Sequence, residues 1–133
     1  MYLFDTDTLS EVLKRAPSPR LLARLAAVPA EEQFTSAITV GEMVYGAYRS
    51  QRRDHLLRQL GERVWSQVRV LPFDRAAAER YGALRARLEE TGTTVAEPDL
   101  RIASIALTHD LTVVTGNTRH FQRIPELRVE NWM

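Results

Sequence analysis

Three carboxylates and one carboxamide stand where this sequence passes from one predicted element to the next. Asp5 ends the apolar run Tyr2 to Phe4, which is typical of a strand buried on both faces. Glu42 and Asp99 fall in the first turns of predicted helices, and Asn117 follows a later apolar strand. Oxygen ligands suit Mg²⁺ or Mn²⁺, which take one or two carboxylates and leave the other positions to water and phosphates. A cation held in this way can activate water against a phosphodiester.

Strand-like and helix-like segments alternate along the chain, which predicts an α/β fold. We expect a single domain over residues 1–133, an α/β/α sandwich with a mostly parallel sheet of about four to five strands. At one edge of such a sheet the carboxyl ends of the strands meet the amino ends of the helices, so the four polar groups can share a cleft. Strands are predicted at 2–4, 33–39, 68–73, 111–114 and 127–129, and helices at 9–15, 19–28, 39–48, 56–65, 75–91, 100–108 and 119–122.

Three of the four groups also have a purely structural interpretation. Glu42 can be the partner of Thr39 in a capping box, the pattern in which Thr caps a helix and Glu three residues later reaches back. Asp99, following a Pro98 at the first helical position, can complement the helix dipole. Asn117 lies in a Gly-Asn-Thr turn, where asparagine is common. These roles remain open from the sequence and are compatible with a site.

Asp5 is the member that is hardest to explain structurally. A carboxylate at the end of a buried strand carries a desolvation cost unless it has a partner. Asp7, two residues on, either caps the first helix or supports the site. A second capping-box pattern, Thr8 to Glu11, predicts that this helix begins after Thr8.

The composition is that of an ordinary globular protein, with 44% hydrophobic and 26% charged residues. The absence of cysteine excludes disulfides, thiolate metal sites and cysteine nucleophiles. No apolar run approaches membrane-spanning length and no signal peptide is recognisable, so we expect a cytoplasmic protein without a membrane partner. The net charge is +1, and Lys14 is the only lysine. This excess of arginine suits phosphate recognition, although a GC-rich genome would also produce it.

Six stretches, which together cover most of the chain, resemble a PIN domain, and within that family a VapC-type toxin of bacterial toxin–antitoxin pairs. They surround the four polar groups, the long predicted helix and the end of the chain. The stretches are FDTDTLSE, TSAITVGEMVYGA, LPFDRAAAERYGALRARLEETG, PDLRIASIAL, LTVVTGNTRHF and LRVENW.

The resemblance implies a metal-dependent endoribonuclease with Mg²⁺, or Mn²⁺, in an acidic pocket. Asp5 resembles the first metal-binding aspartate and Asp99 the later acidic ligand, while Glu42 resembles the conserved glutamate and would hold or deprotonate the attacking water. Asn117 stands where many members have aspartate and a subset has asparagine, and it would orient a water or the scissile phosphate.

Supporting positions follow from the same resemblance. Thr6 resembles the hydroxyl residue beside the first aspartate, and Thr115 the one that supports the pocket from the fourth strand. Two departures stand out: Asp7 replaces the usual Asn or Ser of the opening motif, and His120 replaces an acidic residue before Phe121. The far side of the pocket is therefore less acidic, which predicts one ion rather than two and weakly favours manganese.

The resemblance also implies partners and a substrate. Family members usually form homodimers and are held inactive by a small antitoxin, and their substrates are structured RNAs, often tRNA cut in the anticodon region. Three arginines near the predicted pocket are candidates for RNA phosphate contacts, with ordinary surface positions as the alternative. They are Arg101, Arg119 and Arg123.

Two other functions compete with the nuclease. The opening Asp-x-Asp-x-Thr also matches haloacid-dehalogenase-type phosphatases, in which Asp5 would be the nucleophile and Asp7 the general acid. The chain is short for that fold, and its only lysine is Lys14. Alternatively, the protein is a non-catalytic partner of its antitoxin in a DNA-bound autoregulatory complex, an interpretation that the His120 departure keeps open.

Overall fold

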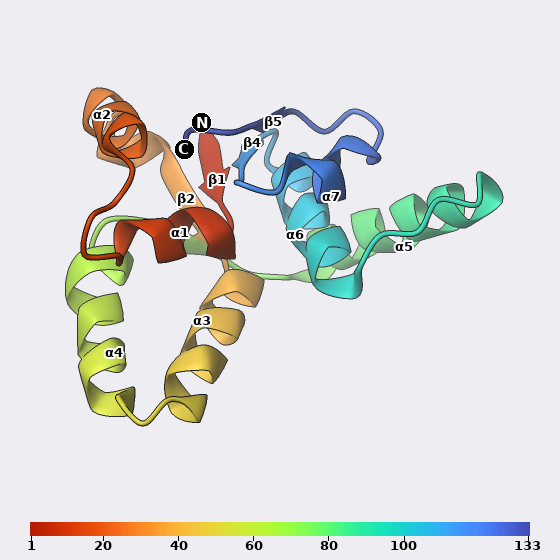
Figure 1. Cartoon of the computed structure of the whole chain (residues 1–133). Coiled ribbons are helices and arrows are strands. Elements are labelled where there is room, and N and C mark those ends of the chain that lie inside the picture. The colour runs from red at the N-terminus through yellow and green to blue at the C-terminus, as the bar shows by residue number, and fades with distance from the viewer.

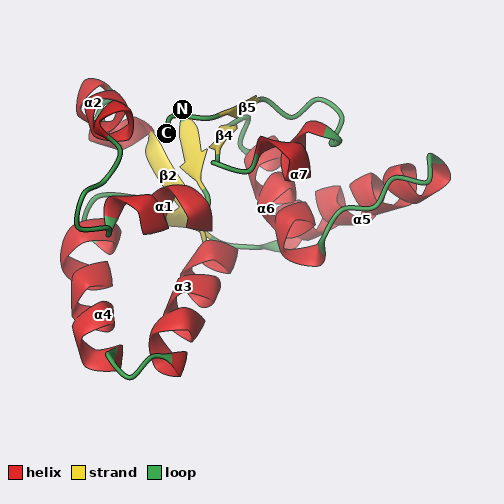
Figure 2. Ribbon diagram, viewed as in Figure 1, coloured by secondary structure: helices red, strands yellow, loops and turns green.

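The computed structural model describes all residues from 1 to 133 and has at its centre a five-stranded, wholly parallel sheet. The strand order is β3-β2-β1-β4-β5, with β1 in the middle (Figure 2). This confirms the predicted α/β fold with a parallel sheet. The strands are β1 (Tyr2–Phe4), β2 (Gln33–Ser36), β3 (Arg69–Leu71), β4 (Thr112–Val114) and β5 (Val129–Glu130).

Helices cover both faces of the sheet, and the α3–α4 hairpin projects away from it (Figure 1). Helix α4 continues as one stretch of π-helix, η2, and a short 3₁₀ turn, η1, precedes β2. No helix combines the length and the apolar character needed to cross a bilayer. The helices are α1 (Thr6–Val12), α2 (Pro19–Ala27), η1 (Ala30–Glu32), α3 (Ala37–Arg49), α4 (Arg53–Gln59), η2 (Leu60–Trp65), α5 (Arg75–Glu90), α6 (Glu97–Thr108) and α7 (Thr118–Gln122).

Alternating side chains of β1 enter two separate hydrophobic cores, because successive residues of a strand point to opposite faces. Leu3 joins Val113 of β4 in the core covered by α5, α6 and α7. Phe4 joins Val114 in the core covered by α1 to α4 and closed by Trp132. Both β1 side chains are fully buried. The residue that follows them, Asp5, is consequently fixed between two packed layers.

The strand order reverses beside β1. The chain runs from β1 to β2 and β3 on one side of the sheet, and returns to β4 and β5 on the other. In open parallel sheets such a reversal leaves a crevice at the carboxyl ends of the strands. Asp5 and Thr115 directly follow the two strands that border this crevice.

The first helix begins three residues earlier than predicted, and its cap is Asp5 rather than Thr8 or Asp7. The Asp5 carboxylate accepts a hydrogen bond from the backbone N–H of Thr8 at 3.1 Å. The Thr8 hydroxyl is buried and donates to the carbonyl of Val114 at 2.8 Å instead. The predicted capping box between Thr8 and Glu11 is therefore wrong. Glu11 lies in the second turn of α1, and its carboxylate accepts a hydrogen bond from the N–H of Ser18.

The same error affects the predicted cap of the third helix. Strand β2 ends at Ser36, and the Ser36 hydroxyl accepts from the N–H of Thr39, so α3 begins at Ala37. Glu42 then lies in the second turn and cannot be the partner in a capping box. Helix α6 also begins earlier than predicted, at Glu97, which places Pro98 second and Asp99 third in the helix. In contrast, α5 begins at Arg75 as predicted. The Asp74 side chain caps it by accepting from the N–H of Ala77, and a left-handed Gly92 follows its end.

Candidate active site

A pocket lies at the carboxyl edge of the sheet, where β1 and the first turns of α1, α6 and α7 meet the second turn of α3. Four carboxylates line it, and none of its lining residues is lysine or arginine. The structure therefore brings together the four groups that the sequence singled out, although they span more than a hundred positions. The lining residues are Asp5, Thr6, Asp7, Glu42, Ala96, Pro98, Asp99, Ile102, Asn117, His120 and Phe121.

Asp5 is the most deeply placed of the carboxylates, with only 6% of its surface exposed. The pKa of its carboxyl is raised from 3.8 to about 6, above all by burial and also by the nearby charge of Asp7. Hydrogen bonds from the Thr115 hydroxyl and from Thr8 oppose this shift. Asp5 therefore has hydrogen-bond donors but no cationic side chain to stabilise its charged form, which is the state that an ion in the pocket would favour.

Glu42 reaches the pocket from α3 and is held by the residue next to Asp5. The Thr6 hydroxyl donates a hydrogen bond of 2.8 Å to Oε1 of Glu42. Glu42 itself is exposed, so it stays accessible to water. This contact links α1 to α3 and sets the predicted glutamate beside the buried aspartate.

Asp99, His120 and Asn117 form the opposite wall. The Nδ1 atom of His120 lies 3.3 Å from an Asp99 oxygen, and the Asn117 side-chain nitrogen lies 3.2 Å from the imidazole. Burial raises the pKa of Asp99; His120 lowers it and Asp7 raises it. Because the His120 ring contacts Asp99, it forms part of the pocket wall. Separately, the backbone N–H of Asn117 donates to the Thr115 hydroxyl at 2.9 Å.

Asp7 is exposed and lines the pocket, and it caps no helix. Its charge raises the pKa of both Asp5 and Asp99, so it lies close enough to both to act electrostatically. Of the two roles that the sequence left open for Asp7, the structure retains the one at the site. Its contribution is an additional negative charge in the pocket.

The donor set fits a cation that is held mostly through water. No three acidic or imidazole side chains lie close enough together to hold an ion by themselves. Asp5 and Asp99 nevertheless face one pocket with raised pKa values, and a divalent cation would relieve the cost of their charges. Mg²⁺ typically keeps several waters and binds only one or two carboxylates.

None of the three predicted RNA-contacting arginines lines this pocket. Arg123 borders an adjoining hollow with Asp99 and His120 and donates to the carbonyl of Thr94. Arg119 is exposed in the first turn of α7. Arg101 pairs with Glu97 at 3.5 Å, and its guanidinium lies 5.8 Å from the ring centre of Tyr81 on α5.

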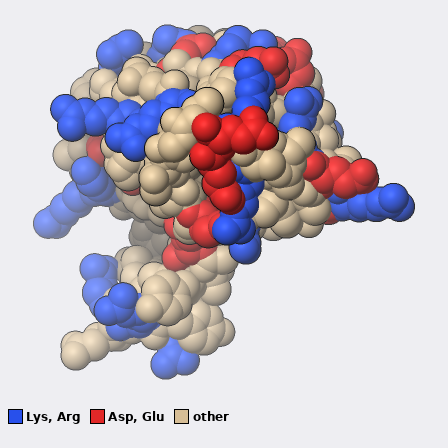
Figure 3. All heavy atoms as spheres, turned by 90° about the vertical axis from the view of Figure 1, so that its right-hand side faces the viewer, with Lys and Arg blue, Asp and Glu red and all other residues tan.

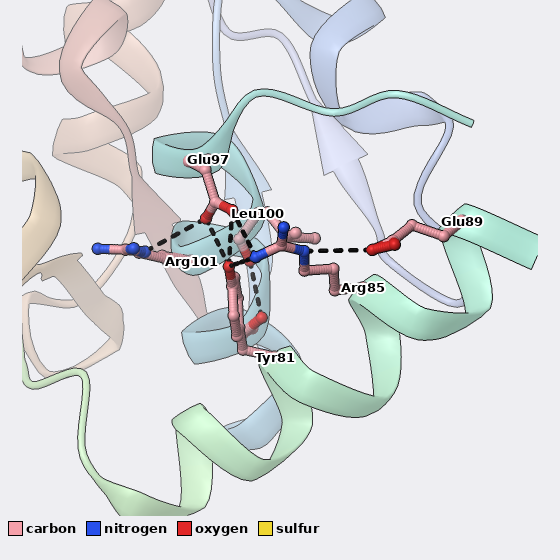
Figure 4. Close-up of polar contacts among 7 residues, drawn as sticks. Tyr81, Arg85, Glu89, Glu97, Leu100 and Arg101 are labelled. Atoms are coloured by element: carbon pink, nitrogen blue, oxygen red, sulfur yellow. Dashed lines mark hydrogen bonds and ion pairs between the residues drawn. The ribbon is translucent and has the colours of Figure 1, made fainter. Parts of the chain in front are cut away.

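A cluster that sequence reasoning missed holds the first turn of α6 against α5 (Figure 4). The Tyr81 hydroxyl donates to the Glu97 carboxylate at 2.6–2.7 Å, and Arg85 contacts both of them. These contacts, above all the Tyr81 hydroxyl, hold the pKa of Glu97 below its usual range. Tyr81 and Arg85 are four residues apart on one helix face, which was the available signal. Because Glu97 is two residues from Asp99, this cluster positions the Asp99 wall of the pocket.

Replacement of Tyr81 by phenylalanine tests this positioning. The variant keeps the ring that packs against Phe73 but loses the hydroxyl, so the melting temperature should fall by a few degrees. The RNA cleavage that the resemblance implies should fall by about tenfold, because small displacements of a catalytic group are costly. Thermal melting and cleavage rates check this, with Tyr2→Phe, at a tyrosine that does not line the pocket, as the control. An unchanged cleavage rate in a destabilised Tyr81→Phe would show that the cluster supports only the fold.

Comparison with known proteins identifies the family. The PIN-domain model matches residues 2–127. The chain belongs to the PIN-domain family. This PIN-domain protein is 33% identical over 132 residues to ribonuclease VapC2 of Haemophilus influenzae, covering 99% of this chain and 98% of that one. It is 34% identical over 131 residues to the tRNA(fMet)-specific endonuclease VapC of Salmonella typhimurium, covering 98% and 97%.

Comparison with solved structures points to the same family as comparison with the sequences of the relatives. The VapBC2 complex of Rickettsia felis, bound to a DNA fragment from its promoter, contains a chain that matches with a TM-score of 0.90 at 29% identity, covering 99% of this chain and 98% of that one. The predicted PIN-like fold and the membership among VapC-type ribonuclease toxins are thereby confirmed. This PIN-domain protein is consequently not a haloacid-dehalogenase-type phosphatase.

Proposed function

We propose that this PIN-domain toxin hydrolyses RNA at the pocket around Asp5 with the help of a divalent cation, Mg²⁺ or Mn²⁺. The observation that carries the proposal is the pocket itself, in which four carboxylates meet without an arginine or lysine. A phosphate could not approach four negative charges unless a cation were bound there. We further propose that the whole chain acts as one PIN domain.

The position of each side chain in the pocket determines the role that we propose for it. Asp5 and Asp99 bind the cation, directly or through water. A hydrogen bond from Thr115 stabilises the charged form of the Asp5 carboxylate. A bound divalent cation would supply a more acidic water and neutralise charge on the phosphate. Glu42, oriented by Thr6, holds the attacking water and accepts its proton. Asn117 orients the water or the phosphate from the opposite wall, and Asp7 strengthens the attraction for the cation.

The relatives support the proposed partners. The similar Rickettsia felis and Salmonella typhimurium proteins are seen as VapBC complexes bound to DNA, which supports a cognate antitoxin for this chain. The name of the Salmonella relative gives tRNA(fMet) as its target, which supports a structured RNA such as tRNA as the substrate. A homodimer in the cytoplasm is part of the same proposal.

Cleavage by the purified chain tests the function. In the presence of Mg²⁺ or Mn²⁺ it should cut a tRNA pool at few positions, and sequencing of the new RNA ends should locate them. EDTA should stop the reaction, and the co-purified antitoxin should suppress it. If the folded chain cuts no RNA with either metal but still binds promoter DNA together with its antitoxin, the non-catalytic alternative would replace this proposal.

A further inference from the structure

The outward face of α3 leads away from the pocket. Glu42, Tyr45 and Arg49 follow one another at intervals of three and four residues, so they lie along one face of the helix. The hydrogen bond from Thr6 holds Glu42 at the pocket end. At 1.5 Å per residue, Arg49 is about 10 Å further along the helix axis. This face therefore runs from the catalytic pocket toward the tip of the α3–α4 hairpin.

Two tyrosines on this hairpin are exposed in the single chain and belong to neither hydrophobic core. Tyr45 is 62% exposed, the highest value among the large apolar side chains, and Tyr48 is 55% exposed. Each ring is paired with an arginine, since the Arg49 guanidinium lies 5.5 Å from the ring centre of Tyr45 and that of Arg53 lies 5.0 Å from Tyr48. These pairs offer an aromatic surface together with positive charge, a combination that suits nucleobases beside phosphates.

The surroundings of the hairpin are strongly basic, although the net charge of the chain is only +1. On the face shown in Figure 3, the projecting hairpin carries lysine and arginine side chains and no visible acidic one, whereas the body above it carries both. A hollow between the end of α1 and α4 has five basic lining residues and no acidic one; these are Lys14, Arg15, Arg52, His55 and Arg63. Arg52 joins this hollow to the tip that carries Tyr48 and Arg53.

We propose that the α3–α4 hairpin is the RNA-binding arm of this enzyme. A base next to the scissile phosphate stacks on Tyr45, Arg49 binds the following phosphate, and the basic residues around Arg52 bind the backbone beyond. This inference rests on the proposed ribonuclease function and adds where the substrate lies. The charge favours RNA over a protein partner, since unpaired bases and phosphates are what exposed tyrosines and arginines bind together in single-stranded RNA loops.

RNA binding without cleavage tests the arm. The probe is a fluorescein-labelled tRNA anticodon stem–loop in saturating Mg²⁺, followed by fluorescence anisotropy. Every chain in this binding assay, including the one with the wild-type arm, also carries Asp5→Asn so that it does not cleave the probe. Tyr45→Ala should weaken binding by about 5- to 100-fold, the range for loss of one stacked base, and Tyr45→Phe should bind like the wild type. Arg49→Ala should weaken binding and reduce the slope of affinity against salt by about one. Arg75→Ala is the matched control on α5, where the side chain is 92% exposed, and should change neither.

The outcomes separate this inference from the function on which it rests. If Tyr45→Ala and Arg49→Ala bind the probe like wild type while wild type cleaves RNA, the proposed RNA-binding arm is ruled out and the proposed ribonuclease function is retained. If wild type neither binds nor cleaves RNA, the proposed function fails, and the arm fails with it. Light scattering at the assay concentration adds a third result: if Tyr45→Ala changes the number of chains per particle, the surface joins copies of the protein and the arm is also overturned.

Discussion

Asp5→Asn is expected to abolish metal-dependent RNA cleavage and, in metal-free buffer, to make the fold more stable at pH 7.5. The loss of activity follows because the amide brings no charge to the cation. The gain in stability follows because the native carboxyl is buried and its pKa is raised to about 6. Asparagine caps helices as well as aspartate does, so the hydrogen bond from Thr8 should be retained.

The direction of the stability change depends on pH. The folded carboxyl binds its proton more tightly than the unfolded one, whose pKa is 3.8. Its unfavourable effect is therefore absent below pH 4, grows as the pH rises toward 6, and is complete above 6, where it reaches up to about 3 kcal/mol. Urea unfolding of wild type and Asp5→Asn at pH 4 and pH 7.5 measures it, and the difference between them should appear only at the higher pH.

Asp74→Asn is the matched control, because Asp74 caps α5 by accepting from Ala77 in the same way but is exposed and remote from the pocket. It should change neither cleavage nor stability at either pH. If Asp5→Asn were less stable than wild type at pH 7.5, the burial of an unpaired charge at Asp5 would be ruled out. Full cleavage by a well-folded Asp5→Asn would rule out the catalytic role.

Cleavage should fall as the pH drops below 6, by about tenfold per pH unit at subsaturating Mg²⁺. The reason is competition, since a carboxyl with a raised pKa binds a proton in place of the cation. The pKa of Asp99 is also raised, so the decline should steepen at lower pH. Rates measured from pH 5 to 8 at several Mg²⁺ concentrations would show the midpoint moving to lower pH as Mg²⁺ increases.

Thr115→Val tests the source of this pH dependence. The Thr115 hydroxyl lowers the pKa of Asp5 by a hydrogen bond, so its removal should move the midpoint to higher pH. The valine is close in volume, and the site is fully buried. A midpoint that is independent of both Mg²⁺ concentration and Thr115 would show that another group controls the rate.

The sequence was sufficient to predict the sheet and the meeting of Asp5, Glu42, Asp99 and Asn117, because parallel topology brings strand ends and helix starts to one edge. It failed at the caps, where several hydroxyl and carboxylate residues compete for the same N–H groups. Thr8 matched a capping pattern, but its hydroxyl is needed by the carbonyl of Val114 across the sheet. Such a contact depends on residues a hundred positions away and cannot be found by local spacing.

The positioning cluster and the hairpin surface were missed for a different reason. The contact of Tyr81 with Glu97 depends on how α5 crosses α6, and spacing within either helix does not contain that angle. Tyr45 and Tyr48 fall within a predicted helix, where aromatic residues usually pack into the core. Only their exposure shows that they do not contribute to the core.

Direct counting of bound Mn²⁺ tests the central claim independently of catalysis. Electron paramagnetic resonance of free Mn²⁺, titrated with metal-free protein at pH 7.5, should show one bound ion per chain. Asp5→Asn and Asp99→Asn should each weaken this binding by at least about tenfold, the scale expected for loss of a charged ligand, whereas Asp74→Asn should bind like wild type. Equal binding by wild type and Asp5→Asn, or RNA cleavage by a wild-type chain that binds no ion, would contradict the account.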